Sequence, residues 1–141
     1  MRKLNEETPL VIIARTQVKD GKKEEYLKFG KEIDDIVNDT EPGMLFHDLN
    51  CDFDNSCSFT WTEILKDSSS FVFHLNSPDV KRTIKKQVEL IDSWSIEIYG
   101  KVSEEVLGKI RELDVPFKYF KTTGVNYVRD FWKLILSTSE E

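Results

Sequence analysis

The stretch from residue 58 to residue 91 constrains the fold most, because a strand pattern leads there directly into a split helical pattern. Its first part, SFTWTEIL, is rich in the β-branched and aromatic residues that favour strands. Asp67 and the serines after it interrupt this strand. Ser77 then caps a new helix and Pro78 occupies its first turn, where a missing N–H costs nothing. We therefore expect a strand, a short apolar helical turn and then an amphipathic helix.

The rest of the chain supplies the other strands and the first helix of a layered domain. Residues 22–38 place apolar side chains at helical spacing on one face, and the short polar loop at 51–57 joins two strands in an antiparallel hairpin. The order strand, helix, strand, strand, helix, strand is typical of the ferredoxin-like α+β fold, in which helices cover one face of a four-stranded antiparallel sheet. The predicted strands are 9–18, 44–50, 58–65 and 93–102.

The sequence divides into three parts. Residues 1–8 are polar and are expected to be ragged, residues 9–102 hold the ferredoxin-like domain, and residues 103–141 form a C-terminal extension. In the extension, Ser103 is expected to cap a helix that runs to about Leu113, and an aromatic-rich strand or arm follows. The extension is too apolar for a free tail, so we expect it to pack on the domain or on a partner subunit. Its aromatic residues are Phe117, Tyr119, Phe120, Tyr127, Phe131 and Trp132.

The predicted strands carry more apolar residues than two helices can cover. Helices on one side protect one face of the sheet, and a single chain would leave the other face as a large exposed apolar patch. We therefore expect a second copy to pack sheet against sheet in a closed twofold homodimer. The residues behind this expectation are Val11, Ile13, Phe46, Trp94, Ile96 and Ile98.

Composition narrows the class of protein. With 39% hydrophobic residues, 33% charged residues and a net charge of −6, the chain is typical of globular proteins and lacks the basic face that nucleic acids require. No apolar run reaches the ~20 residues of a membrane-spanning helix, and the N-terminus lacks the apolar segment of a signal peptide, so we expect a cytoplasmic protein. Cys51 and Cys57 are expected as free thiols, with a disulfide across the hairpin loop as the alternative.

Several short motifs, in their order along the chain, are similar to those of a known family. VKDGKKEEYL follows the first strand, EPG precedes the second, and E-x-x-x-D followed by HLNSPDV spans the third strand and the helical break. Over residues 9–102 this pattern resembles the antibiotic biosynthesis monooxygenase family of dimeric α+β barrels. The resemblance implies a cofactor-independent monooxygenase that holds a small phenolic or quinol-like substrate between sheet and helices. Fold is a poor guide to reaction, so a non-catalytic ligand-binding or structural protein is the alternative.

The haem-degrading branch of that family can be compared residue by residue. Its members use an Asn on the first strand, a Trp at the end of the third strand, and a His on the second helix as iron ligand. The first strand of this chain, with Arg15, Thr16 and Gln17, has no Asn. Leu65 stands in the position of the Trp, and the helix after Pro78 contains lysines but no His. We therefore expect neither haem degradation nor a bound cofactor or metal.

The two histidines are the candidate catalytic residues. His74 matches the His of the family's H-L-x-S-P pattern, and it would either accept a phenolic proton or brace the break between the helical pieces. His47 lies between Phe46 and Asp48, whose side chains point to the opposite face of the strand. Its neighbours on the same face are leucines. We therefore interpret His47 either as a base in the pocket or as a core residue whose hydrogen bonds are made within the protein.

Six further residues are expected to bind the substrate. Trp61 and Glu63 share one face of the third strand, where Trp61 would stack on a planar ligand and a buried Glu63 would need a partner. Arg15 on the first strand is the candidate partner of Glu63, in an ion pair with a structural role. The remaining three are Tyr26, Phe29 and Phe73. In a third interpretation, the aromatic C-terminal segment fills the pocket of a purely structural protein.

Overall fold

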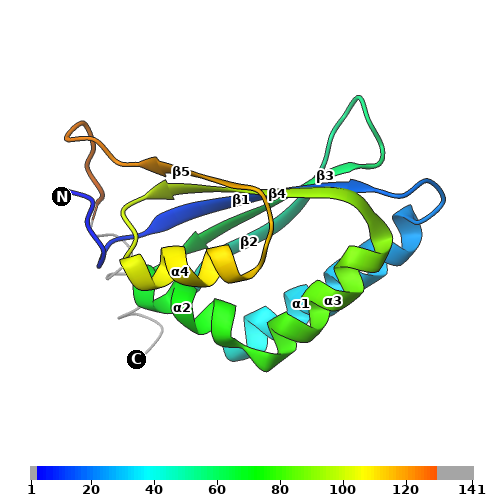
Figure 1. The fold of residues 1–141 in the computed structure, drawn as a ribbon, viewed down its shortest axis with the longest axis horizontal. Helices are drawn as coiled ribbons and strands as arrows, with labels where there is room; N and C mark the ends of the chain where they lie inside the picture. Colours follow the sequence, from blue (N-terminus) through cyan, green and yellow to red (C-terminus); the bar gives the residue numbers. More distant parts are fainter. Residues whose placement is uncertain (1–2, 130–141) are drawn as a thin grey trace.

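The computed structural model describes residues 3–129, in which one mixed sheet of five strands has four helices on one face (Figure 1). The sheet is the upper layer of the view and the helices are the lower layer. The strands are β1 (Leu10–Val18), β2 (Met44–Cys51), β3 (Ser58–Leu65), β4 (Ile91–Gly100) and β5 (Phe117–Lys121). The helices are α1 (Lys23–Thr40), α2 (Ser68–Asn76), α3 (Pro78–Leu90) and α4 (Glu104–Glu112).

The strand order in the sheet is β2-β3-β1-β4-β5. The first four strands pair antiparallel, which confirms the predicted ferredoxin-like arrangement. The sheet is mixed and has one strand more than the four predicted, because β5 of the C-terminal extension adds to the free edge of β4 in the parallel direction. After β4 the chain crosses through α4, and a helical crossover of this kind returns the next strand in the same direction.

Side-chain caps start three helices at the breaks that the sequence indicated. Asp67 accepts a hydrogen bond from the Ser70 amide at the start of α2, and Ser77 accepts one from the Val80 amide at the start of α3. Ser103 caps α4 in the same way. Each cap satisfies an amide that the first helical turn leaves without an intrahelical partner. The chain after β3 therefore forms two separate helices, as predicted.

Alternation along the strands separates the two faces of the sheet. On β1, Ile12 is buried beneath the helices, whereas Arg15 is exposed on the outer face. On β4, Ile98 is fully buried opposite Ile12, and Trp94 and Ile96 line a cavity on the helix side. These β4 residues were expected to help make both faces apolar, but all three lie on the helix side, so the outer face is less apolar than the sequence indicated.

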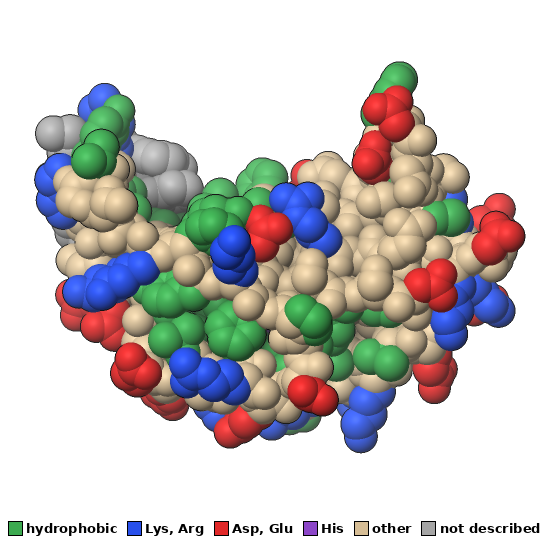
Figure 2. Space-filling view, turned by 45° about the horizontal axis from the view of Figure 1, so that its top comes forward, with side chains coloured by type: hydrophobic (Ala, Val, Ile, Leu, Met, Phe, Trp, Pro, Cys, Tyr) green, Lys and Arg blue, Asp and Glu red, His purple; other side chains and the backbone are tan. Residues whose placement is uncertain are grey.

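The outer face of the sheet is hollowed between two projections, the β2–β3 loop and the segment after β5 (Figure 2). No helix within residues 3–129 covers it. Arg15 and Glu97 form an ion pair there, with Nε and Oε2 2.7 Å apart, and Tyr99 stacks on Phe120 at 4.8 Å. The apolar and aromatic residues of this face are Val11, Ile13, Phe46, Ile64, Tyr99 and Phe120.

Helix α1 approaches the sheet closely at Gly30. A Cβ atom at this position would lie 2.9 Å from the Leu49 side chain of β2 and 3.4 Å from the Trp61 ring of β3. Glycine on the apolar side of α1 therefore lets the helix pack directly on the strands. This close packing brings α1 over the site described below.

Both ends of the described chain pack on the domain. The Leu4 amide donates to Asn126 Oδ1 at 2.9 Å, and Lys3 Nζ donates to the Asn126 carbonyl at 2.8 Å. Helix α4 packs against α2, and β5 extends the sheet. The extension thus packs on its own chain through α4 and β5, while Phe131 and Trp132 of the predicted arm are outside the described residues.

Candidate active site

A cavity of about 80 Å³ lies between the sheet and the helices. Most of its wall is apolar, with contributions from four strands and all four described helices. A largely apolar pocket with a few converging polar groups is the usual form of a small-molecule site. Besides the indole N–H groups of two tryptophans, the polar residues of the wall are His47 on β2, Glu63 on β3, His74 on α2, and Thr83 and Gln87 on α3.

His74 is held between two buried carboxylates. Its Nδ1 donates to Glu41 at 2.7 Å, and its Nε2 lies 3.5 Å from Oε2 of Glu63. Burial lowers the pKa of His74, but the charges of Glu63 and Glu41 and the hydrogen bond to Glu41 outweigh burial and raise this pKa above its ordinary 6.5. The arrangement favours the imidazolium form, in which both ring nitrogens are donors and neither accepts a proton.

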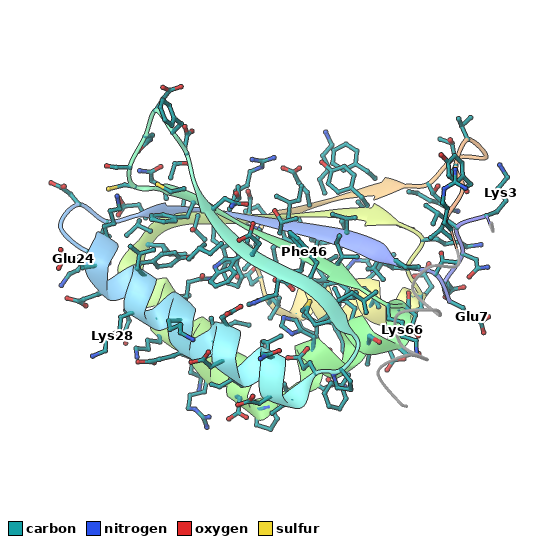
Figure 3. The ribbon with its side chains drawn as sticks, turned by 180° about the vertical axis from the view of Figure 1, so that it is seen from behind. Lys3, Glu7, Glu24, Lys28, Phe46 and Lys66 are labelled. Carbon is teal, nitrogen blue, oxygen red and sulfur yellow. The ribbon has the colours of Figure 1, made fainter. Side chains whose placement is uncertain are left out.

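His47 contacts one carboxylate, and that carboxylate is half-exposed. Its Nδ1 lies 2.8 Å from Oδ1 of Asp34 on α1, and its ring stacks on Trp61 with centroids 4.8 Å apart. An ionised carboxylate only accepts hydrogen bonds, so Nδ1 carries the proton of the neutral ring and Nε2 keeps its lone pair. No described residue hydrogen-bonds Nε2. Figure 3 labels the adjacent Phe46 on β2, the edge strand that carries His47.

Glu63 lies between the two histidines. It is the cross-strand partner of His47 in the β2–β3 pair, and it faces His74 from the sheet. Its Oε2 is buried and has no hydrogen-bond partner among the described residues, because the 3.5 Å separation from His74 is too long for a good hydrogen bond. A buried carboxylate oxygen without a partner costs free energy that a ligand hydroxyl would recover.

Two predicted substrate-binding residues lie away from the cavity. Arg15 is opposite Thr60 in the β1–β3 pair and pairs with Glu97 on the outer face, so the predicted ion pair with Glu63 is wrong. The two side chains cannot meet because they point to opposite faces of the sheet. Phe73 is 56% exposed on the solvent side of α2, where it lines a separate surface hollow.

Trp61 is fixed by a buried chain of hydrogen bonds. Its Nε1 donates to the Tyr26 hydroxyl oxygen at 3.1 Å, and that hydroxyl donates to Gln87 Oε1 at 2.8 Å. Thr16 also contacts the hydroxyl at 3.0 Å. Burial raises the pKa of Tyr26 above its ordinary 10.0, so the hydroxyl stays protonated. Tyr26 thus supports the wall from behind, whereas Trp61 and Phe29 line the cavity directly.

Several residues of the site were not singled out from the sequence. Asp34 and Glu41 are the carboxylate partners of the two histidines, and Gln87 anchors the hydroxyl of Tyr26. Trp94 lines the cavity with a buried Nε1 that has no hydrogen-bond partner in the described chain. Glu41 was interpreted only as part of the EPG turn. Asp34 follows Gly30 by one helical turn, which puts it beside the apolar stripe and is the signal that could have found it.

Within residues 3–129, no group of three or more His, Cys, Asp or Glu side chains is placed to hold a metal ion. Cys51 and Cys57 are free thiols. None of the described helices is long and apolar enough to cross a membrane.

Residues 9–86, more than half of the chain, match the family described as antibiotic biosynthesis monooxygenase. A conserved protein from Methanosarcina mazei Go1 is 25% identical in sequence, with a TM-score of 0.63, over 68% of this chain and 95% of its own. A provisionally named antibiotic biosynthesis monooxygenase from Bacteroides thetaiotaomicron is 21% identical, with a TM-score of 0.59, over 64% and 86%. One from Caulobacter crescentus is 17% identical, with a TM-score of 0.63, over 66% and 89%. No curated protein matches the chain.

Proposed function

Because the chain belongs to the antibiotic biosynthesis monooxygenase family, we propose that its cavity binds a small phenolic or quinol-like substrate and oxidises it with molecular oxygen. One observation carries this proposal. His47 has an Nε2 without a hydrogen bond, and its cross-strand partner Glu63 has a buried Oε2 without one. A substrate hydroxyl that binds by donating to Glu63 would lie beside a base, Nε2 of His47, to which the same proton passes in the reaction.

His47 is the general base in this proposal. It takes the hydroxyl proton on Nε2, while Nδ1–H keeps its bond to Asp34, whose charge stabilises the imidazolium that forms. The phenolate gives one electron to O₂, the two radicals combine in a new bond between a ring carbon and oxygen, and the resulting peroxide takes the proton back from Nε2 of His47. Loss of water from this hydroperoxide breaks the O–O and ring C–H bonds, so one phenol and one O₂ yield one quinone and one water.

His74 is a positioning residue in this proposal. The hydrogen bond to Glu41 and the charge interactions with Glu41 and Glu63 favour the imidazolium, which has no lone pair to accept the substrate proton. The imidazolium instead offsets the charge of Glu63 and holds that carboxylate at the cavity wall. Removal of His74 should therefore act through Glu63 and through stability.

The size of the cavity limits the substrate. Its volume of about 80 Å³ is well below the ~300–1000 Å³ of pockets for drug-sized ligands, so a single aromatic ring is the class it suits. Oxygen consumption measured with single-ring and multi-ring phenols and quinols tests the proposal. Single-ring compounds should give uptake that multi-ring compounds do not, with a quinone product in equal amount. No uptake with any single-ring compound would contradict the proposed reaction and favour a ligand-binding protein without turnover.

The outer face of the sheet supports a proposal about assembly. We infer that two chains pair sheet against sheet, because this face carries Phe46 at 46% and Phe120 at 40% exposure and lies between two projections that would flank a partner. Sedimentation at micromolar concentration should show a dimer. Phe46→Glu, which places a charge in the paired face, should convert it to a monomer, and a monomeric wild type would contradict the assembly.

A further inference from the structure

A second hollow, of about 340 Å³, opens between α3 and α4 beside the cavity. Leu75, Ile84 and Leu113 line both spaces, so these three side chains form the partition between them. The hollow falls within the ~300–1000 Å³ range of ordinary ligand pockets, whereas the cavity behind it does not. A ligand that enters the cavity from this side would leave part of itself in the hollow, which we call the α3–α4 groove.

The α3–α4 groove is basic although the chain as a whole is acidic. Lys81 and Lys85 of α3 and Lys109 of α4 line it, and Glu112 is its one carboxylate. None of the three lysines forms an ion pair with a described residue. The neighbouring Arg82 and Lys86 of α3 point elsewhere and are paired with Asp79 and Glu32. Three lysines without an ion pair among residues 3–129 therefore line one groove of a chain whose net charge is −6.

The charges around the histidine end of the cavity are mostly of the opposite sign. Glu63 lines the cavity and Asp34 and Glu41 lie behind the two histidines, so a substrate carboxylate is disfavoured at that end by like-charge repulsion. A substrate with a neutral hydroxyl at one end and an anionic group at the other would fit both ends. The hydroxyl would meet Glu63, and the anionic group would remain among the lysines.

We propose that the α3–α4 groove is the entrance to the cavity and recognises a carboxylate on the substrate, which is then a single-ring phenol with a carboxylate side chain. This inference rests on the proposed function and names its substrate class. Ammonium groups attract a carboxylate, raise its rate of encounter and orient it, and the effect weakens with salt. Leu113 and Ile84 must separate to admit the ring.

Part of the recognition element belongs to this chain's C-terminal extension. Lys109, Glu112 and Leu113 lie at the end of α4, beyond the residues 9–86 that match the family. The same helix contributes Ile110 to the cavity wall. The C-terminal extension therefore both narrows the cavity and supplies one side of its entrance.

Calorimetric titration without oxygen tests the proposal, because it measures binding and not turnover. The probes are 3-(4-hydroxyphenyl)propanoate and its methyl ester, which differ in one charge. The acid should bind more tightly, and the combined Lys81→Gln, Lys85→Gln and Lys109→Gln variant should weaken it by about tenfold with the ester unchanged. The control removes three lysines that line neither space and have no ion pair with a described residue, by Lys23→Gln, Lys28→Gln and Lys66→Gln. Figure 3 labels Lys28 and Lys66.

Equal binding of acid and ester, or an equal loss in the groove variant and the control variant, would overturn the inference. Absence of binding by both probes would overturn it as well. Charge-selective binding that depends on the groove lysines, without oxygen uptake in air, would leave the groove as an anion-recognition site and contradict the proposed oxidation. The two proposals therefore fail in distinguishable ways.

Discussion

The two histidines sit at the same cavity but in different electrostatic surroundings. His74 lies between the buried carboxylates of Glu41 and Glu63, which together raise its pKa. His47 contacts the single carboxylate of Asp34, whose side chain is 46% exposed, and stacks on Trp61. Low-dielectric surroundings strengthen the first set of charge interactions, and solvent screens the second.

This difference separates a structural histidine from a chemical one. Two buried carboxylates favour a positive His74 in which both ring nitrogens carry protons, so the ring stabilises its neighbours and has no site for a substrate proton. One carboxylate on Nδ1 fixes the tautomer of His47 and leaves Nε2 with a lone pair. A matching sequence motif pointed to His74, whereas the geometry favours His47 as the base.

The largest expected effect is on turnover in His47→Gln. Loss of the base should lower the rate of substrate oxidation by about 10²- to 10⁴-fold, because that is the usual contribution of general base catalysis. Steady-state oxygen consumption measures it. A control for folding is the free energy of unfolding, which should change little because Asp34 is half-exposed. Turnover within twofold of wild type would exclude His47 as the base.

The second effect is on stability in His74→Gln. Removal of the imidazolium leaves two buried carboxylates without a counter-charge, and breaking such a pair costs roughly 3–5 kcal/mol. Urea denaturation, with His47→Gln as the matched variant, gives the difference in unfolding free energy. If the two variants were equally stable, the contrast between the two histidines would be lost.

A smaller effect is expected for Asp34→Asn. The variant removes the charge that stabilises the protonated form of His47 but keeps an amide oxygen that can accept from Nδ1–H. A half-exposed ion pair is worth up to about 1 kcal/mol, so turnover should fall by less than about tenfold. The substrate KM should stay near the wild-type value, because Asp34 does not line the cavity. A change in KM with no change in kcat would mean that Asp34 shapes the pocket and not the base.

The pH dependence of stability distinguishes the same two residues. The folded protein raises the pKa of His74, so it binds more protons than the unfolded chain does above pH 6.5. The contribution of His74 to the free energy of unfolding is fully present below pH 6.5 and is lost as the pH rises through the raised pKa. Thermal unfolding from pH 6 to pH 9 should show this decline in wild type and a weaker one in His74→Gln; parallel curves would be evidence against a charged His74.

The layer order of the fold was predictable, but the pairings within the site were only partly so. Caps at Ser77 and Ser103 and the strand alternation around Trp61 are local signals. The local sequence does not indicate which face of the sheet each residue of β1 occupies, because residues 9–18 are mostly apolar on both faces. Arg15 was therefore assigned to the wrong face. The parallel addition of β5 also depends on how the chain returns after α4.

The carboxylate partners of the histidines were beyond sequence reasoning for a similar reason. Asp34 meets His47 because α1 packs back over β2, and Glu41 meets His74 because the turn before β2 lies against α2. Both pairs join residues from separate elements, and no local spacing predicts which elements will touch. The cavity of about 80 Å³ depends in addition on Ile110 and Leu113 of the extension.

Nitrogen-15 NMR of the two histidine rings at neutral pH tests the difference between His74 and His47 most directly, with His47→Gln to assign the signals. His74 should show two protonated nitrogens, and the neutral form of His47 should show a protonated Nδ1 and a bare Nε2. A bare ring nitrogen on His74 at pH 7, or a protonated Nε2 with a bare Nδ1 on neutral His47, would contradict the roles assigned to both residues.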